Sequence, residues 1–206
     1  MNQYEADKLY SQIYYDYPKY RMGLTRLAGI LYAIINVPDE ERSEFYDIGC
    51  GRFETRDVVG PAFKVCRGYD LPNVVRRLGY PDDMHQIMGL THLHMSDNEA
   101  SVVGCFDVLE HLPPEDIDAA LAQLTRVARN RLILSIALYS HIFEGTELHL
   151  TIENEKWWTE KLAQFPHHKL SAHVAQKTLW IVLETPKSPE ARSAHDSACH
   201  CTNLRD

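Results

Sequence analysis

The 206-residue sequence lacks several features that mark whole classes of protein. No stretch approaches 18 uninterrupted apolar residues, the length of a membrane-crossing helix. The start, MNQYEADKLY, has neither the basic nor the apolar region of a secretory signal. Only five cysteines are present, and their spacing is not that of a disulfide framework. These absences predict a cytoplasmic protein without membrane attachment.

Basic residues are also in short supply. The 21 Lys and Arg residues against 29 Asp and Glu residues give a formal net charge of −8, whereas attraction to a nucleic-acid backbone needs clustered positive charge. One local cluster, Arg126, Arg129 and Arg131, lies in a stretch predicted to pass from helix to strand, where solvated charge is the commoner interpretation. The balance disfavours nucleic acid and favours a small-molecule partner.

Hydrophobic periodicity divides the chain into helical and extended stretches. Residues 4–36 carry apolar residues at helical spacing with a break near Pro18, which predicts two helices capping the domain at residues 1–36. Short apolar runs then alternate with helical patterns. Strands are expected at 45–48, 64–69, 84–88, 100–108, 131–138, 169–174 and 178–184, and helices at 56–63, 73–79, 115–128 and 156–164.

This alternation predicts an α/β fold in a single domain over residues 1–185. Its sheet should be mainly parallel and twisted, with helices on both faces and an antiparallel strand near the C-terminus. Residues 186–206 are rich in small and polar residues without apolar period, which predicts a flexible tail.

The first expected strand ends in Asp47-Ile48-Gly49-Cys50-Gly51. Glycines at this place let the chain turn sharply and let a ligand approach the backbone, and the next helix presents free N–H groups to a negative charge. Asp70 ends the next strand, 23 residues after Asp47, where a carboxylate can accept hydrogen bonds from ribose hydroxyls. An ordinary strand-to-helix turn is the alternative for the glycines alone.

The segments YDIGCGRFET, RGYDLP and CFDVLEHLPPEDID, in this order, resemble the motif set of the Rossmann-fold S-adenosylmethionine-dependent methyltransferases. The resemblance covers residues 45–184. It implies a Rossmann-like methyltransferase domain with S-adenosylmethionine as its cofactor.

Carried over residue by residue, the resemblance assigns a cofactor site. The loop residues Asp47, Gly49, Cys50 and Gly51 would seat the methionine moiety; Asp70 would hold the ribose hydroxyls and Leu71 would touch the adenine; Phe106 and Asp107 would border the sulfonium. Two positions depart from the pattern: Phe53 replaces the third glycine, and Gly89-Leu90 replaces a Gly-Asp pair that contacts adenine. An adenine contact is therefore expected from the backbone at Leu93 or His94.

Methyl transfer to a hydroxyl needs a positioned acceptor and a base. The candidates are Glu110 and His111, just past Asp107, and His149 in the loop after the fifth strand, before the pair Trp157-Trp158. The carboxylate of Asp107 or Glu110 could hold the second ring nitrogen of His149. The alternatives are that Glu110-His111 only caps the following helix and that His149 and the tryptophans are core residues.

Metal binding is a further alternative. Asp107, Glu110, His111 and His149 supply two carboxylates and two imidazoles, a set compatible with Mg, Mn or Zn. The spacing DVLEHL also resembles metal-dependent O-methyltransferases, including those acting on ubiquinone precursors and on the terminal 2′-hydroxyl of small RNAs, but metal-free relatives share VLEHL. Cys199-His200-Cys201 has no second ligand pair at zinc spacing and is discounted.

The sequence therefore predicts an O-methyltransferase acting on a small-molecule or glycan hydroxyl. The segment HLTIENEKWWTEKL loosely resembles one in methyltransferases of surface-polysaccharide synthesis. The rival hypothesis is a noncatalytic S-adenosylmethionine-binding or interaction domain that uses its tyrosine-rich amino-terminal helices as a contact surface. The tyrosines concerned are Tyr10, Tyr14, Tyr15, Tyr17 and Tyr20.

Overall fold

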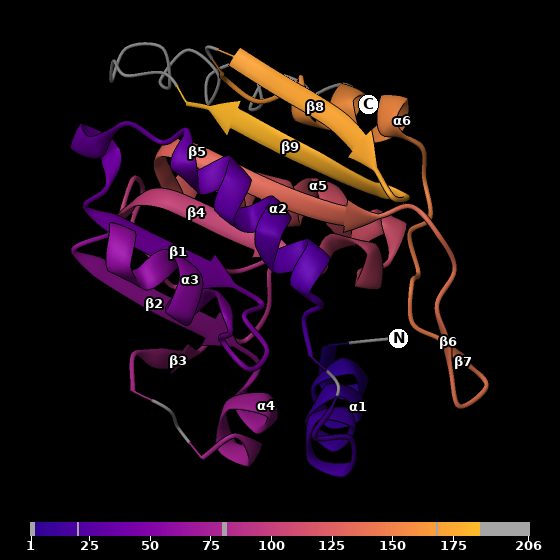
Figure 1. Ribbon diagram of the computed structural model, residues 1–206. Helices are drawn as coiled ribbons and strands as arrows, with labels where there is room; N and C mark the ends of the chain where they lie inside the picture. Colours follow the sequence, from indigo (N-terminus) through magenta and orange to yellow (C-terminus); the bar gives the residue numbers. More distant parts are fainter. Residues whose placement is uncertain (1–2, 20, 80–81, 168, 186–206) are drawn as a thin grey trace, which may run out of the picture.

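A seven-stranded sheet with the order β3-β2-β1-β4-β5-β9-β8 forms the centre of the computed structural model (Figure 1), which describes residues 3–19, 21–79, 82–167 and 169–185. The strands are β1 Glu44–Ile48, β2 Val65–Asp70, β3 Met84–Gln86, β4 Ala100–Phe106, β5 Ala128–Ala137, β8 Lys169–Ala175 and β9 Thr178–Glu184. Strands β1 to β5 run parallel, and β9 lies antiparallel between β5 and β8. The predicted mainly parallel sheet with a late antiparallel strand is confirmed.

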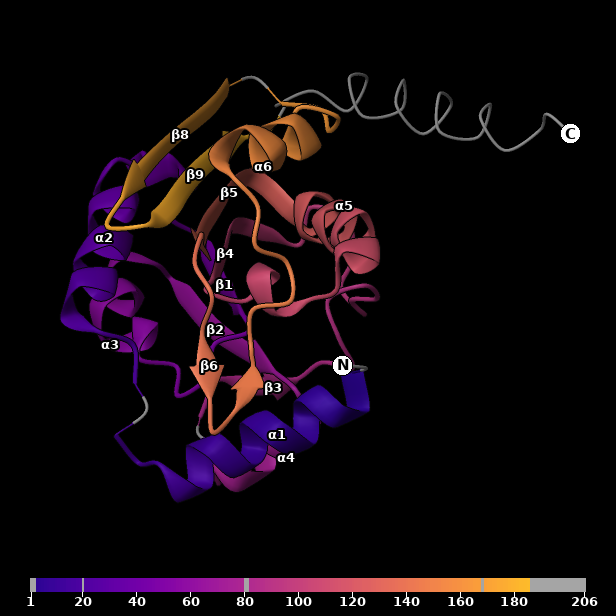
Figure 2. The ribbon, with the colours of Figure 1, turned by 90° about the vertical axis from the view of Figure 1, so that its right-hand side faces the viewer.

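Helices cover both faces of this sheet, as expected for parallel strands joined by crossovers. The helices are α1 Gln3–Asp16, α2 Leu24–Ile35, α3 Thr55–Val59, α4 Pro72–Arg77, α5 Ile117–Val127 and α6 Glu155–Leu162. Figure 2 looks toward the carboxyl ends of the parallel strands: α2 and α3 lie on one side of the sheet, α5 and α6 lie on the other, and α1 crosses in front. The two amino-terminal helices on either side of Pro18 are as predicted.

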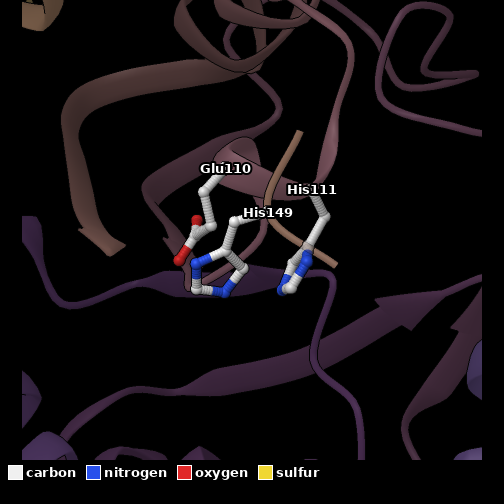
Figure 3. Close-up of side chains that lie close together, drawn as sticks. All are labelled: Glu110, His111 and His149. Atoms are coloured by element: carbon white, nitrogen blue, oxygen red, sulfur yellow. The ribbon is translucent and has the colours of Figure 1, made fainter. Parts of the chain in front are cut away.

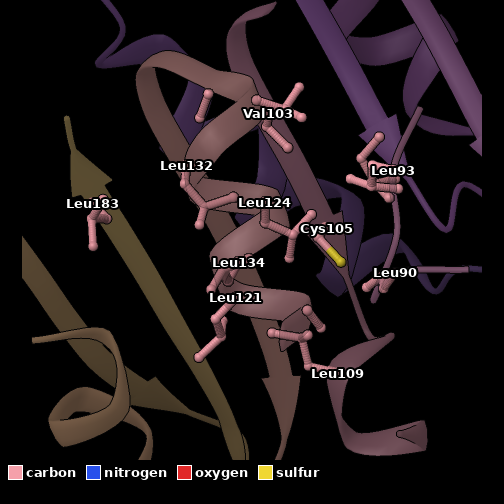
Figure 4. Packing of buried hydrophobic residues seen from close by; sticks show 14 of the residues in the cluster. Leu90, Leu93, Val103, Cys105, Leu109, Leu121, Leu124, Leu132, Leu134 and Leu183 are labelled. Atoms are coloured by element: carbon pink, nitrogen blue, oxygen red, sulfur yellow. The ribbon is translucent and has the colours of Figure 1, made fainter. Parts of the chain in front are cut away.

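The larger part of the core lies between the sheet and helix α5. Leu121 and Leu124 of α5 pack with Leu132 and Leu134 of β5 (Figure 4), and every residue of β4 is buried. A smaller cluster on the opposite face joins α2, through Ile30 and Ile34, to the sheet. Each such buried side chain contributes about 1.5–3 kcal/mol to folding, so the sheet is a rigid base for the loops at its carboxyl edge.

Some element boundaries differ from those expected. Helix α3 stops at Val59 and continues only as a 3₁₀ turn, Gly60–Ala62, because Pro61 cannot donate a backbone hydrogen bond. Residues 142–147, where no strand was expected, form a hairpin of β6 Ile142–Phe143 and β7 Thr146–Glu147. Its two turn residues, Glu144 and Gly145, both have positive φ, as tight hairpin turns require. Glutamate is rare at the first position of such a turn, so the sequence contains no signal for the hairpin.

Within the described ranges, no helix is both long and apolar enough to cross a membrane. The predicted tail at 186–206, including Cys199-His200-Cys201, lies outside the described residues, as does Tyr20.

Candidate cofactor and catalytic site

The chain leaves β1 through a turn that depends on glycine at two positions. Gly49 and Gly51 have φ values of 79° and 53°, in the left-handed region that side chains disfavour. The backbone N–H groups of Gly49 and Cys50 both donate to the carbonyl oxygen of Tyr69, at 2.7 and 3.1 Å, which ties the turn to the end of β2. A Cβ atom on Gly49 would lie 2.4 Å from a methyl carbon of Val108. The turn therefore lies directly against the end of β4.

Asp70 ends β2 opposite this turn. Its two carboxylate oxygens accept hydrogen bonds from the backbone N–H groups of Gly51 and Leu71, each at 2.7 Å. Each carboxylate oxygen can accept a second bond, and Asp70 lines a cavity. Burial raises the pKa of Asp70 to about 6. The predicted ribose acid is thus fixed in place by the glycine turn while retaining acceptor capacity toward the cavity.

Phe53 takes the place of a glycine without blocking the cavity. Its φ of 55° keeps the left-handed conformation that a glycine would adopt. The ring turns inward and packs with Val75 and Met84. Gly68 on β2 leaves the necessary space, since a Cβ atom there would lie 2.8 Å from the ring. This departure from the motif is therefore compensated within the core.

A small cavity of about 150 Å³ lies at the carboxyl ends of β1, β2 and β4. Asp70 and Leu71 form one wall, Ile87, Leu90 and Thr91 form another, and helix α1 closes the front through Ala6, Tyr10 and Tyr14. Leu90, the second departure from the motif, thus lines the place where adenine was expected. Leu93 and His94 are not among the lining residues; Leu93 is buried in the core under α5.

A larger cavity of about 1020 Å³ adjoins the small one, and Tyr14, Gly49, Asp107 and His111 line both. It runs past Phe106 and along α2 over the face of β9 and β8. At its inner end Asp107 has a φ of 55° and pairs with Arg26 of α2, Nε to Oδ2 at 2.5 Å. Ser135 donates to its other oxygen at 3.0 Å. Burial raises the pKa of Asp107, and the Arg26 charge opposes that shift. Nothing in the sequence pointed to Arg26.

Three predicted catalytic residues, Glu110, His111 and His149, come together at this inner end (Figure 3). Each has an atom suited to bind a metal, and these atoms all lie within 4.8 Å of one another. Glu110 and His111 belong to a 3₁₀ turn, Leu109–His111, and the Glu110 carbonyl accepts from the N–H groups of Leu150 and Thr151, at 2.7 and 3.0 Å. These two bonds hold the loop that carries His149.

Backbone carbonyls fix both imidazole rings. Nδ1 of His149 lies 2.5 Å from the Tyr139 oxygen, and Nδ1 of His111 lies 2.8 Å from the Leu148 oxygen. Because a carbonyl only accepts, Nδ1 carries the proton in each ring and Nε2 keeps a lone pair. From the sequence, Asp107 or Glu110 could have held the second ring nitrogen of His149; the Tyr139 carbonyl takes this role instead. Tyr10 Oη of α1 also lies 2.7 Å from His111 Nδ1.

The charges in this group are set mainly by burial. Burial, reinforced by the negative charge of Asp107, raises the pKa of Glu110 to about 8, so that this carboxyl group holds a proton at neutral pH. Ala137 N–H donates to Oε1 at 2.8 Å, but Oε2 has no hydrogen-bond partner among the described residues. Burial lowers the pKa of His111 to about 4 and also lowers that of His149, so both rings are neutral at pH 7.

Other predicted site residues lie farther from the cavities. Asp47 is buried behind the glycine turn, where one oxygen accepts from Thr55 and the other has no partner within the described part of the chain. It lines neither cavity, whereas Cys50 and Gly51 line the larger one. Burial raises the pKa of Asp47 to about 7. Trp157 and Trp158 also line neither cavity; Trp158 is a core residue.

The tyrosines do not share one contact surface. Tyr10 and Tyr14 line the small cavity. Tyr15 is exposed beneath the Arg77 guanidinium, and Tyr17 contacts Phe143 in the β6–β7 hairpin with ring centroids 5.0 Å apart. Sequence reasoning missed that α1 covers the cavity, because helical spacing shows which face is apolar but not what it faces.

Neither a protein-family model nor a curated protein sequence matches this chain. Solved structures do match. A Haloferax volcanii protein in a complex with the methyltransferase activator Trm112 is 14% identical, with TM-score 0.66 over 86% of this chain and 97% of that one. Magnesium protoporphyrin IX methyltransferase from Synechocystis PCC 6803, with bound SAM, is 15% identical, with TM-score 0.61 over 90% and 98%. The chain has the Rossmann-like fold of the S-adenosylmethionine-dependent methyltransferases.

The methyltransferase fold recurs in more distant chains. Phosphoethanolamine N-methyltransferase 2 from Haemonchus contortus, in complex with S-adenosyl-L-methionine, is 9% identical, with TM-score 0.60 over 80% of this chain and 53% of that one. Because such a fold hosts many chemistries, the acceptor has to be argued from the site itself.

Proposed function

We propose that this chain is an S-adenosylmethionine-dependent methyltransferase that methylates a hydroxyl group of a small-molecule or glycan acceptor. One observation carries the proposal: the glycine turn and Asp70 face a cavity that continues, past Asp107, to the neutral imidazole of His149. The SAM-bound Synechocystis and Haemonchus methyltransferases of the same fold support this choice of cofactor.

The residues present fit the cofactor. Asp70 retains acceptor capacity for ribose hydroxyls, and Leu71, Ile87 and Leu90 offer an apolar seat for adenine. The glycine turn lines the larger cavity through Gly49 and Gly51, with space for the methionine moiety. Asp107, which lines both cavities, marks the junction at which the sulfonium would lie.

S-adenosylmethionine supplies a methyl group already activated for transfer, so the protein has to position the acceptor and remove its proton. His149 Nε2 is the proposed proton acceptor, because Nδ1 is committed to the Tyr139 carbonyl and the ring is neutral at pH 7. Glu110 is protonated at that pH and is not the base. The acidic net charge favours a neutral or cationic acceptor over RNA.

A metal-dependent form of the same reaction is the second candidate, favoured by the unpartnered Oε2 of the fully buried Glu110. With Nε2 of His111 and His149 it makes a two-histidine, one-carboxylate set whose imidazoles are oriented by backbone carbonyls, as metal ligands commonly are. Asp107 is committed to Arg26 and Ser135 and stays outside the set. A divalent cation held there would supply positive charge that lowers the pKa of the acceptor hydroxyl.

The first test is formation of S-adenosylhomocysteine with pools of hydroxylated small molecules and glycans. His149→Ala should lower turnover by roughly 10²- to 10⁴-fold, the usual contribution of a general base, and leave cofactor affinity nearly unchanged. His92→Ala, an exposed histidine that lines neither cavity, is the matched control and should keep full activity. Cofactor binding without turnover on any pool would instead support the noncatalytic hypothesis.

Chelation separates the two candidates. Under the metal-dependent candidate, treatment with a chelator abolishes turnover and Mg²⁺ or Mn²⁺ restores it. Calorimetric titration of the protein with Mn²⁺ should then show one site, which Glu110→Gln weakens at least roughly 10-fold, as removing a ligand does. Full activity in chelator, with no Mn²⁺ binding, would eliminate the metal and leave His149 as the base.

A further inference from the structure

Helix α2 exposes an apolar stripe on the face turned away from the sheet. Leu24, Leu31 and Ile35 have exposed fractions of 86%, 47% and 66%, and Ala28 between them is exposed too. Figure 2 shows α2 as the outermost layer on this side of the molecule. The one charged residue of the helix, Arg26, points inward to Asp107. Among the side chains of α2 that the structure describes, the outward face thus offers solvent mostly apolar groups, which marks an interaction site rather than a solvated helix.

The spacing of this α2 stripe identifies the kind of surface that covers it. Leu24, Ala28, Leu31 and Ile35 are separated by four, three and four residues, the a/d spacing of a helix that packs along another helix. A second helix of similar length, about 18 Å for 12 residues, would match this register along the whole stripe.

The stripe is complementary to itself when two copies run antiparallel. Leu24 of one chain then faces Ile35 of the other, and the large Leu31 faces the small Ala28, which leaves room for it. A parallel pair would instead place Ala28 against Ala28 and leave a gap, which close-packed interfaces avoid. Two antiparallel helices also oppose their dipoles favourably. This matching of large to small residues argues for a second copy of the same chain.

Charges at the two ends of α2 agree with this arrangement. Arg21, 3.8 Å from Glu54, precedes the helix with its side chain 65% exposed. Asp39, paired with Arg42 at 2.9 Å, follows the helix with its side chain 92% exposed. In an antiparallel pair Arg21 of each chain approaches Asp39 of the other. The net charge of −8 and the acidic end at Asp39 and Glu40 disfavour an anionic membrane as the occupant.

The exposed area of the stripe approaches that of a small dimer interface. The α2 stripe with the adjacent exposed Tyr32 presents roughly 500 Å² of mostly apolar surface per chain, or about 1,000 Å² for a pair. Flanking polar residues bring this near the 1,200 Å² or so at which specific interfaces begin. We propose that the protein forms a twofold-symmetric homodimer through antiparallel packing of α2 on α2.

Sedimentation of the full chain over a range of concentrations tests the dimer with a matched pair of variants. Ile35 and Ile142 are equally exposed, at 66%, but Ile142 lies in the β6–β7 hairpin. Ile35→Glu should weaken association at least roughly 100-fold, because two carboxylates would be buried unpaired. Ile142→Glu should leave the dimer intact. Unchanged thermal melting of both variants shows that each still folds.

Orientation is tested by disulfide trapping in chains that carry Cys199→Ser and Cys201→Ser. A mixture of Leu24→Cys and Ile35→Cys chains should cross-link, whereas either chain alone should not, because like positions lie at opposite ends of an antiparallel pair. Cross-linking of a single variant with itself would overturn the antiparallel arrangement. A monomer at every concentration, or a dimer unaffected by Ile35→Glu, would overturn the proposal. Flotation of a monomeric protein with anionic vesicles, abolished by Ile35→Glu, would also overturn the proposal. That result would assign the stripe to a membrane.

Discussion

Asp70 has two tasks within the small cavity. Its carboxylate closes the glycine turn through the N–H groups of Gly51 and Leu71, and it presents the remaining acceptor sites to the cavity. Because the oxygens are already oriented by backbone donors, a ribose that binds there meets acceptors that need little reorganisation. This preorganisation makes Asp70 the most informative single residue for testing the cofactor site.

Asp70→Ala should weaken S-adenosylmethionine binding by roughly 1–3 kcal/mol, the scale of lost charge-assisted hydrogen bonds. Calorimetric titration measures the change. The control is Asp118→Ala, which removes an exposed carboxylate of α5 that pairs with Lys161 of α6. This variant should bind the cofactor as the parent does. An Asp70→Ala protein with undiminished affinity would show that the ribose lies elsewhere.

Glu110 gives the stability of the protein a distinct pH dependence. The carboxyl group ionises near its ordinary pKa of 4.5 in the unfolded chain but near 8 in the folded protein. The folded state therefore holds one more proton across this interval, and its stability falls as pH rises through it. The lowered pKa values of His111 and His149 act in the opposite sense, but below about pH 6.5, where unfolded histidine gains its proton.

Between pH 6.5 and pH 8, Glu110 should lower the free energy of unfolding by about 1.5 kcal/mol, and Asp47, with a pKa of about 7, by about half as much. Urea unfolding in the presence of a chelator measures both. In Glu110→Gln the Glu110 share should be lost and the stability should depend less on pH, whereas the exposed Glu115→Gln should keep the parent slope. Identical pH profiles for the parent and Glu110→Gln would contradict a protonated Glu110.

At the scale of elements, the sequence predicted what periodicity and turn chemistry encode. The strand β9 and the glycine turn after β1 follow from alternation and from Gly49 and Gly51. Two things were not predictable from local pattern: the β6–β7 hairpin, whose turn uses Glu144 at positive φ, and the position of α1 over the cavity. The second depends on long-range contacts such as Tyr10 with His111, 101 residues apart.

Helix α1 is attached to the rest of the protein mainly through polar contacts. Ile13 is its one fully buried large apolar side chain among the described residues, whereas Asp7 accepts from the Asn73 N–H at 2.9 Å and Tyr10 contacts His111. An element with so little apolar burial opens at low free-energy cost. The small cavity, at about 150 Å³, is also below the roughly 300 Å³ of ordinary ligand pockets. We therefore expect α1 to move when the cofactor enters.

Hydrogen exchange should detect this coupling. On addition of S-adenosylmethionine, amides of α1 should exchange at least roughly 10-fold more slowly, because the ligand adds contacts to Ala6, Tyr10 and Tyr14. Amides of α6, which lines neither cavity, serve as the internal control and should not change. Equal protection of both helices would indicate global stabilisation, and unchanged exchange in α1 would show that it does not cover the cofactor.

At the scale of the whole molecule, the distribution of charge separates small acceptors from RNA. The three arginines that form the local basic cluster are each engaged: Arg126 pairs with Asp97, Arg129 with Glu44, and Arg131 with Glu41 and Glu184. They extend from the end of α5 into the start of β5, at the opposite end of the parallel strands from Asp107 and His149. Their charge is therefore paired within the protein. Arg131 nevertheless lines the larger cavity, and its side chain, 12% exposed, forms buried ion pairs rather than the solvated charge expected from the sequence.

Single-stranded RNA should accordingly bind poorly, because the local arginine cluster is paired with carboxylates and the net charge of −8 repels phosphates. We expect a dissociation constant weaker than roughly 100 µM at physiological salt, beyond the usual range for nonspecific binders. Fluorescence anisotropy with a labelled oligonucleotide, repeated at two salt concentrations, measures it. Binding in the micromolar range with a steep salt dependence would mean that cations along the larger cavity, such as Lys169 and Arg21, contact phosphates. RNA 2′-hydroxyls would then replace small-molecule hydroxyls as the acceptor to be tested first.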